Sequence, residues 1–167
     1  MINKKSFISI SLLTFLTFLI INYSVSFFDY QLPDSNSYIN YSPKYKSFYP
    51  FLIEIVNNLN LNLIYVQMLV LSFSIIFLCF SIFKKYNLLI SLILYISIIL
   101  NFFYTSFSKT VLTESIFFSL INIGMGLFIA KNIKNYSYYI YCLVLALLFS
   151  IKSIGFIIVL CFLFLNW

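Results

Sequence analysis

Histidine and arginine are both absent from this chain of 167 residues. Without histidine there is no Ser-His-Asp triad, no histidine metal site and no H-E-x-x-H zinc motif. Charged residues are also scarce, at 8% of the chain, whereas a soluble globular domain carries about 25%. Because 63% of the residues are hydrophobic, this shortage of charge argues against a soluble domain and predicts an integral membrane protein.

The three cysteines give no sign of a disulfide framework or a metal site. Their number is odd, no CxxC pair occurs, and Cys79, Cys142 and Cys161 each lie inside an apolar run. We therefore expect small apolar packing residues at these positions.

The net charge of +6 comes from lysines that stand singly or in pairs beside apolar runs, which favours orientation in a membrane over nucleic-acid binding.

Long apolar runs predict an all-α fold, a polytopic transmembrane helix bundle in a single domain. A bilayer core of about 30 Å needs roughly 20 apolar helical residues. The sequence predicts about six membrane helices, near residues 7–27, 63–83, 88–104, 112–130, 137–150 and 154–167. The first run is longer than the roughly 7–15 apolar residues of a signal peptide, and no A-x-A-like site follows it. We interpret it as a signal anchor.

The last apolar stretch, residues 138–167, allows two interpretations. A single over-long, tilted helix would place Lys152 near its middle, at a cost of about 3 kcal/mol or more. Two helices that turn at SIKSIG, residues 150–155, would each fall short of a full span, because fourteen residues cover only about 21 Å. The turn lets Lys152 reach the headgroups, and Gly155 accommodates a bend. We favour the hairpin.

The lysines favour a cytoplasmic N-terminus. In this orientation the inward-facing lysines are Lys4, Lys5, Lys84, Lys85, Lys131 and Lys134, and the outward-facing ones are Lys44, Lys46, Lys109 and Lys152. All four acids of the chain then fall on the outer side: Asp29, Asp34, Glu54 and Glu114. We therefore expect a multi-pass protein of the cell membrane with a polar site on its outer face.

The segment FYPFLIEIVNNLNL, residues 48–61, predicts a short amphipathic helix at about 49–60, after the first outer loop. Pro50 suits the first turn of a helix, where its missing N–H costs nothing. Glu54, Asn57 and Asn58 are spaced i, i+3, i+4 and share one face, while apolar residues cover most of the rest. Such a helix lies in the membrane interface, either as a plain connector or as a platform that guides a lipid-linked substrate.

The candidate acids each have a structural and a functional interpretation. Glu114 falls in the first turn of the fourth span, where the helix dipole favours an acid by about 0.3–1 kcal/mol. Ionisable residues at membrane depth also tend to serve a function. Asp29 and Asp34 follow the first span, where acids commonly form turns or are solvated. Tyr38 and its neighbouring tyrosines suit an aromatic belt and can also stack on sugar rings.

The order of these motifs resembles the N-terminal half of the integral-membrane GT-C glycosyltransferases of the family 39 type, which use polyprenyl-phosphate sugar donors. The matching segments are PDSNSYI, FYPFLIEIVNNL, LTESIFFSL and IKSIGFIIVL, within about residues 7–165. Asp34 and Tyr38 match the motif of the first outer loop, and Glu114 matches the acid that opens the fourth span. Lys152 stands where the family usually has arginine, so a point charge replaces a bidentate phosphate ligand.

The resemblance implies transfer of a sugar from a polyprenyl-phosphate donor to an acceptor hydroxyl on the outer side of the membrane. Asp34 would act as general base, and Glu114 would be a second catalytic acid that orients the substrate or the loop. Substrate binding would fall to four residues: Asp29, Tyr38, Lys109 and Lys152. The two lysines would offset charge on the phosphate leaving group. No organic cofactor and no metal site are expected, although Asp34 and Glu114 are carboxylates of the kind that hold a divalent cation.

Members of this family are several hundred residues long and have more spans. The resemblance therefore implies that residues 1–167 are the N-terminal part of a larger module, or act with a partner chain that supplies the missing spans. The expected partners are membrane lipid and a polyprenyl-phosphate-linked sugar, with no nucleic acid. The alternative is a non-enzymatic multi-pass protein, either a transporter or an assembly subunit. Transporters place polar residues near the membrane midplane, whereas the acids here fall at the outer ends of spans.

Overall fold

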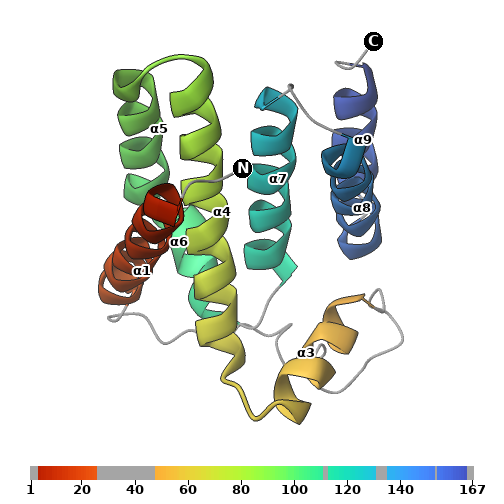
Figure 1. The fold of residues 1–167 in the computed structure, drawn as a ribbon. Helices are drawn as coiled ribbons and strands as arrows, with labels where there is room; N and C mark the ends of the chain where they lie inside the picture. The colour runs from red at the N-terminus through yellow and green to blue at the C-terminus, as the bar shows by residue number, and fades with distance from the viewer. Residues whose placement is uncertain (1–3, 26–47, 111–112, 131–134, 153, 165–167) are drawn as a thin grey trace.

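A computed structural model of the chain describes residues 4–25, 48–110, 113–130, 135–152 and 154–164. Every regular element within these ranges is helical, which confirms the predicted all-α class. The elements are α1 (Lys4–Val25), α3 (Phe48–Asn58), α4 (Leu63–Lys85), α5 (Leu88–Leu100), α6 (Phe102–Ser106), the 3₁₀ turn η1 (Phe107–Lys109), α7 (Thr113–Ile129), α8 (Asn135–Ile151) and α9 (Gly155–Phe164) (Figure 1).

Helix α4 stands at the centre of the bundle and packs against α1, α5 and α7, while α8 packs against α7 and α9. Successive long helices run in opposite directions, so the starts of α4 and α7 and the turn between α8 and α9 lie at one end (Figure 1). The short helix α3 lies across this end, against α4 and α8. We call it the α3 end. The opposite end, which carries Lys84 and Lys85 at the close of α4, is called the Lys84 end.

Helix length separates α4 from the other helices. Among the described residues, Leu63–Lys85 is the one helix whose length and apolar composition suffice to cross a membrane. The other long apolar segments are shorter: Ile8–Ser24 within α1, Leu88–Leu100, Thr113–Ile129 and Tyr139–Ile151. The prediction of about six spans is therefore not supported by helix length. It is taken up below as a proposal.

Asparagine side chains set several helix boundaries. Asn62 Oδ1 accepts a hydrogen bond from Ile64 N at 3.0 Å at the start of α4, and Asn87 Oδ1 accepts one from Ile90 N at 2.9 Å at the start of α5. Asn101 closes α5 and caps α6, because its Oδ1 accepts a hydrogen bond from Tyr104 N at 3.2 Å. The continuous helix expected over residues 88–104 is therefore wrong. The asparagine offers the backbone a local alternative to a continuing helix.

The chain turns where the hairpin interpretation places the turn. Helix α8 ends at Ile151 and α9 begins at Gly155, so the C-terminal apolar stretch forms two helices instead of one.

The amphipathic segment forms α3, which buries Tyr49, Ile53 and Val56 and exposes Glu54. The 3.6-residue period of apolar side chains accounts for this helix, since its buried positions recur every three or four residues.

The cysteines differ in their surroundings. Cys79 is buried in α4 among Ile21, Met68, Leu71 and Ile75, as expected for a small packing residue. Cys142 on α8 and Cys161 on α9 are exposed, so the expectation that they pack within the chain is wrong. All three thiols are free. An apolar run indicates that a residue lies in an apolar helix, but it does not indicate which face of that helix packs against a neighbouring helix.

Small and polar residues line the contact between α4 and α7. Buried positions on α7 recur every three or four residues, at Ser115, Ser119, Asn122 and Gly126. Tyr104 Oη donates to Asn122 Oδ1 at 2.9 Å, Asn122 Nδ2 donates to Ser74 Oγ at 3.1 Å, and Ser74 Oγ donates to Leu71 O at 2.7 Å. Small side chains let helix backbones approach closely, and polar groups then join the helices in apolar surroundings.

Replacing Asn122 by alanine is expected to lower the free energy of unfolding by about 1–2 kcal/mol, because it removes two hydrogen bonds between helices, one buried and one partly buried. Unfolding of the full chain in mixed detergent micelles, titrated with sodium dodecyl sulfate, measures the change. Ser97→Ala is the matched control, since Ser97 Oγ donates only to Ile93 O on its own helix. Equal stability of the two variants would show that the chain of bonds through Asn122 does not hold α6, α7 and α4 together.

Candidate functional site

A carboxylate and an ammonium group meet at the α3 end. Lys152 Nζ donates to Glu114 Oε1 at 2.5 Å, and the two residues are 38 positions apart in the sequence. The side chain of Lys152 is 31% exposed and that of Glu114 is 24% exposed. Solvent therefore reaches the pair, but much of each side chain is covered by the bundle.

Backbone geometry on both sides brings the pair together. Helix α7 begins at Thr113, which places Glu114 in its first turn, where an acid is favoured by the helix dipole. Lys152 lies in the turn after α8, and its carbonyl oxygen accepts a hydrogen bond from Gly155 N at 2.9 Å. Because α8 packs against α7, this turn is held beside the start of α7.

Apolar side chains surround the pair on the bundle side. The centroid of the Phe117 ring is 5.9 Å from Lys152 Nζ, which is a cation–π distance. Phe117, Ile116 and Ile151 are all buried and belong to the apolar cluster shared by α3, α7, α8 and α9. An ion pair that solvent reaches contributes about 1 kcal/mol or less to folding. The main effect of this contact is to fix where the ammonium group of Lys152 points.

The hydrogen bonds define what each group can do chemically. Glu114 Oε1 accepts from Lys152, and Glu114 Oε2 accepts from Thr113 Oγ1 at 3.3 Å. Both carboxylate oxygens therefore have donors, which suits a positioning role better than a general base. A lysine ammonium has three N–H donors, and a single acceptor among the described residues, Glu114, uses one of them. The other N–H groups suit an anion such as a phosphate.

Other polar residues lie at the same end of the bundle. Lys109 closes η1 just before α7 and is partly buried. Gln67 Nε2 donates to Tyr49 Oη at 2.7 Å, and this buried contact ties α3 to α4. Glu54 is exposed on α3. The α3 end therefore gathers both acids that the structure describes, together with two lysines and a buried amide–phenol pair.

The sequence-predicted site residues fall into two groups. The structure brings Glu114 and Lys152 into contact and places Lys109 in η1, which packs against α7, the helix that carries Glu114. Asp29, Asp34 and Tyr38 lie in residues 26–47, outside the described residues. Their roles stay predictions.

Sequence reasoning missed the polar residues that support the site. Gln67 and Asn122 are amides within otherwise apolar helices, and the rarity of such residues in an apolar run is the signal that could have singled them out. Thr113 precedes the predicted acid directly and was not considered as its hydrogen-bond donor. No sequence pattern pointed to the partners of these residues.

The described residues contain no group of three or more His, Cys, Asp or Glu side chains that could hold a metal ion. Glu114 has a lysine and a threonine as its hydrogen-bond partners. The structure does not test the alternative of a divalent cation shared by Glu114 and Asp34, since Asp34 lies outside the described residues.

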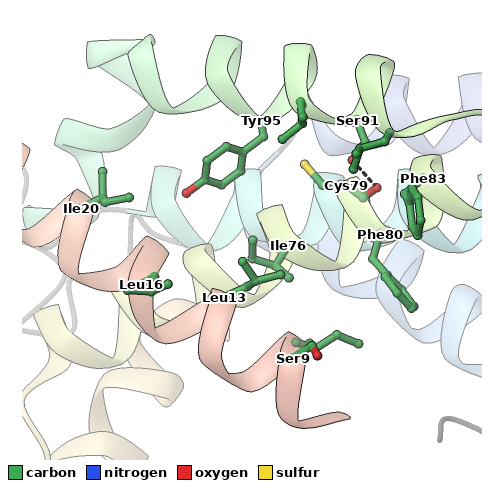
Figure 2. Close-up of a pocket in the computed structure, with 13 residues that line it drawn as sticks. Ser9, Leu13, Leu16, Ile20, Ile76, Cys79, Phe80, Phe83, Ser91 and Tyr95 are labelled. Carbon is green, nitrogen blue, oxygen red and sulfur yellow. Dashed lines mark hydrogen bonds between the residues drawn. The ribbon is translucent and has the colours of Figure 1, made fainter. Parts of the chain in front are cut away.

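A separate cavity of about 500 Å³ lies between α1, α4 and α5 (Figure 2). On α4 it is lined by Ile76, Cys79, Phe80 and Phe83, which belong to the half of this helix nearer the Lys84 end. The ion pair lies at the other end. The site of charge and the site of empty volume are therefore distinct.

No family model, no curated protein and no solved structure matches this chain. Any function proposed for it therefore depends on its own residues and their contacts.

Proposed function

We propose that this chain is part of a membrane glycosyltransferase that transfers a sugar from a polyprenyl-phosphate donor to an acceptor on the outer side of the membrane. The Glu114–Lys152 contact carries the proposal. The GT-C resemblance assigns both residues to the site, and they are in contact although 38 positions separate them. A lysine ammonium group held in a fixed position can offset charge on the donor phosphate, and Glu114 holds this one in place.

A membrane setting is supported by the outward faces of the helices. Leu12, Leu89 and Leu143 are at least 60% exposed, and they lie on three different helices. Large exposed apolar patches are rare on soluble monomers and suit contact with lipid. Helix α4 meets the length requirement, and we propose that α1, α5, α7, α8 and α9 complete a six-span bundle around it. Short spans are accommodated by local thinning of the bilayer.

The lysines of α4 supply the proposed orientation. Lys84 and Lys85 lie at the end opposite the two described acids, Glu54 and Glu114. By the positive-inside rule we assign the Lys84 end to the cytoplasm and the α3 end to the outer side. The amphipathic helix α3 then lies in the outer interface, where it would guide a lipid-linked substrate toward the ion pair.

In the proposed reaction, Lys152 binds the phosphate of the donor through the N–H groups that Glu114 leaves free. The acceptor hydroxyl oxygen attacks the anomeric carbon, the bond from that carbon to the phosphate oxygen breaks, and polyprenyl phosphate leaves with the bonding electron pair. Asp34 takes the proton of the hydroxyl group, in the role that the resemblance implies. The ammonium group offsets the negative charge that develops on the leaving phosphate. Glu114 acts through Lys152 and is a positioning residue.

Replacing Glu114 by glutamine is expected to lower sugar transfer about 10- to 100-fold, by analogy with the loss of a group that orients a metal-ligating side chain. Transfer is measured in membranes that contain the full-length protein, with a radiolabelled polyprenyl-phosphate sugar as donor. Abundance and membrane insertion should stay unchanged, because a partly exposed ion pair contributes little to stability.

Glu54→Gln is the matched control, since it removes the same charge from the exposed face of α3 and should lower transfer less than Glu114→Gln does. A non-enzymatic transporter or assembly subunit predicts a different pattern. If neither membranes with the unaltered protein nor those with Glu114→Gln transfer sugar, while Glu114→Gln disturbs assembly of a complex, the enzyme proposal is wrong and the assembly-subunit alternative is favoured.

A further inference from the structure

The cavity between α1, α4 and α5 is elongated and apolar (Figure 2). Its α1 wall runs from Ser9 to Ile20, about 16 Å along the helix. Leu13 and Ile76 lie between the two ends of the cavity, Phe80 lies beside Ser9 at one end, and Tyr95 lies nearer Ile20 at the other. A volume of about 500 Å³ falls within the range of small-molecule sites.

The polar groups of the lining already have partners. Ser91 Oγ donates to Cys79 O at 2.8 Å, and the Tyr95 hydroxyl shares a hydrogen bond with Thr17 Oγ1 at 3.2 Å. Little in the cavity therefore demands a polar occupant. A linear hydrocarbon chain fits its shape and its chemistry, since burying apolar groups against an apolar wall is favourable.

Cations stand at one mouth of the cavity. Lys84 and Lys85 directly follow Phe83, a lining residue, and both are exposed. Lys84 Nζ lies 4.5 Å from the centroid of the Phe80 ring, which also lines the cavity. Both acids among the described residues lie at the opposite end of the bundle.

We propose that this cavity binds one acyl chain of an anionic glycerophospholipid whose phosphate headgroup is held by Lys84 and Lys85. Charge complementarity selects the headgroup, because the mouth carries lysines and the described acids are at the far end. The donor lipid of the proposed transfer reaction belongs to the Glu114–Lys152 site at the α3 end. The inference requires a membrane setting, but it does not depend on glycosyl transfer.

Lipid binding is tested with the full-length protein in detergent micelles, titrated with phosphatidylglycerol or with phosphatidylcholine of identical acyl chains and observed by native mass spectrometry. Phosphatidylglycerol is expected to bind at least tenfold more tightly. Lys84→Gln combined with Lys85→Gln should weaken its binding about 30-fold, as expected for two lysines near a membrane surface. Lys84→Arg combined with Lys85→Arg should retain it, because the charge is kept. Equal affinity for the two lipids, or no effect of the glutamine variant, would overturn the headgroup assignment.

The acyl-chain position has its own matched pair of variants. Leu13→Trp fills the centre of the cavity from α1 and should weaken phosphatidylglycerol binding at least tenfold. Leu12→Trp adds the same bulk to the neighbouring residue, which is 60% exposed and is not part of the lining, and should leave binding unchanged. Leu92→Trp fills the cavity from α5 and serves if Leu13→Trp does not fold.

If Leu13→Trp or Leu92→Trp binds phosphatidylglycerol as tightly as Leu12→Trp does, the cavity is not the acyl-chain site.

A third lipid identifies the source of the phosphate group. Polyprenyl phosphate at the same concentration is expected to bind this site less tightly than phosphatidylglycerol. Tighter binding of polyprenyl phosphate that Leu13→Trp abolishes would overturn the assignment to a glycerophospholipid.

Discussion

Replacement of Gly155 by alanine is expected to lower the free energy of unfolding by about 3 kcal/mol, because the added methyl group has no space. A Cβ atom at this position would lie 2.1 Å from Leu148 O and 2.7 Å from Leu148 C. Both are backbone atoms of α8 and cannot rotate aside. The start of α9 must therefore move away from α8, and the turn that presents Lys152 to Glu114 moves with it.

The other two glycines of the chain supply matched controls. A Cβ on Gly126 would lie 2.8 Å from the ring of Phe77, and a side chain of this kind can shift, so Gly126→Ala should cost about 1 kcal/mol. A Cβ on Gly124 would have its nearest neighbours at 3.7 Å, in ordinary contact with Phe162 and Val144. Gly124→Ala should be neutral or stabilising by about 0.5–1 kcal/mol, because alanine favours the helix.

Titration of each glycine variant with sodium dodecyl sulfate in mixed micelles gives the three stabilities. The expected order of destabilisation places Gly155 first, Gly126 second and Gly124 last. If Gly155→Ala and Gly124→Ala unfold at the same detergent fraction, α8 and α9 do not pack as closely as the structure has them.

Lys152→Ala is expected to lower sugar transfer about 100- to 1,000-fold, the loss seen when a donor to a developing negative charge is removed. The loss follows because Lys152 is the cation that the proposal assigns to the donor phosphate. Lys152→Arg should keep most of the activity, since a guanidinium group also binds phosphate and arginine stands here in the resembled family. The assay is the transfer of radiolabelled sugar in membranes, normalised to the amount of inserted protein.

The double variant separates a positioning role of Glu114 from an independent one. If Glu114 acts only through Lys152, adding Glu114→Gln to Lys152→Ala should cause no further loss, so the two effects are not additive. Losses that multiply would show that Glu114 contacts the substrate itself. Activity that survives in Lys152→Ala would remove the central residue of the proposed site.

The sequence predicted those features of the fold that depend on neighbours within one or two helical turns. The apolar period identifies α3 as a short amphipathic helix, and the pair of Lys152 and Gly155 marks the turn between α8 and α9. Which apolar residues of α3 are buried was not predicted. The break at Asn101 was missed, because the predicted span over residues 88–104 has apolar residues on both sides of this asparagine. The side-chain acceptor that it offers to Tyr104 N is local information and could have been used.

The candidate site could be predicted only as a set of residues, not as a contact. The first-turn position of Glu114 and the interfacial position of Lys152 each had a local reason, but neither reason pairs one with the other. The same holds for Asn122 with Ser74 and for Thr17 with Tyr95, which are separated by 48 and 78 positions. The exposed faces of Cys142 and Cys161 likewise depend on which helices are neighbours.

By itself, the sequence determined that the chain is helical and rich in apolar residues and where along the chain α3 forms, and it favoured a turn at Lys152. These properties follow from composition and from the spacing of side chains along one helix. Tertiary structure alone decided that Lys152 contacts Glu114 and that a series of hydrogen bonds runs from Tyr104 through Asn122 to Ser74. It also decided that a cavity opens beside Lys84. The physical reason is that apolar helix surfaces do not distinguish one partner helix from another. The pairing of helices is therefore set by small residues and by a few hydrogen bonds between positions far apart in the sequence.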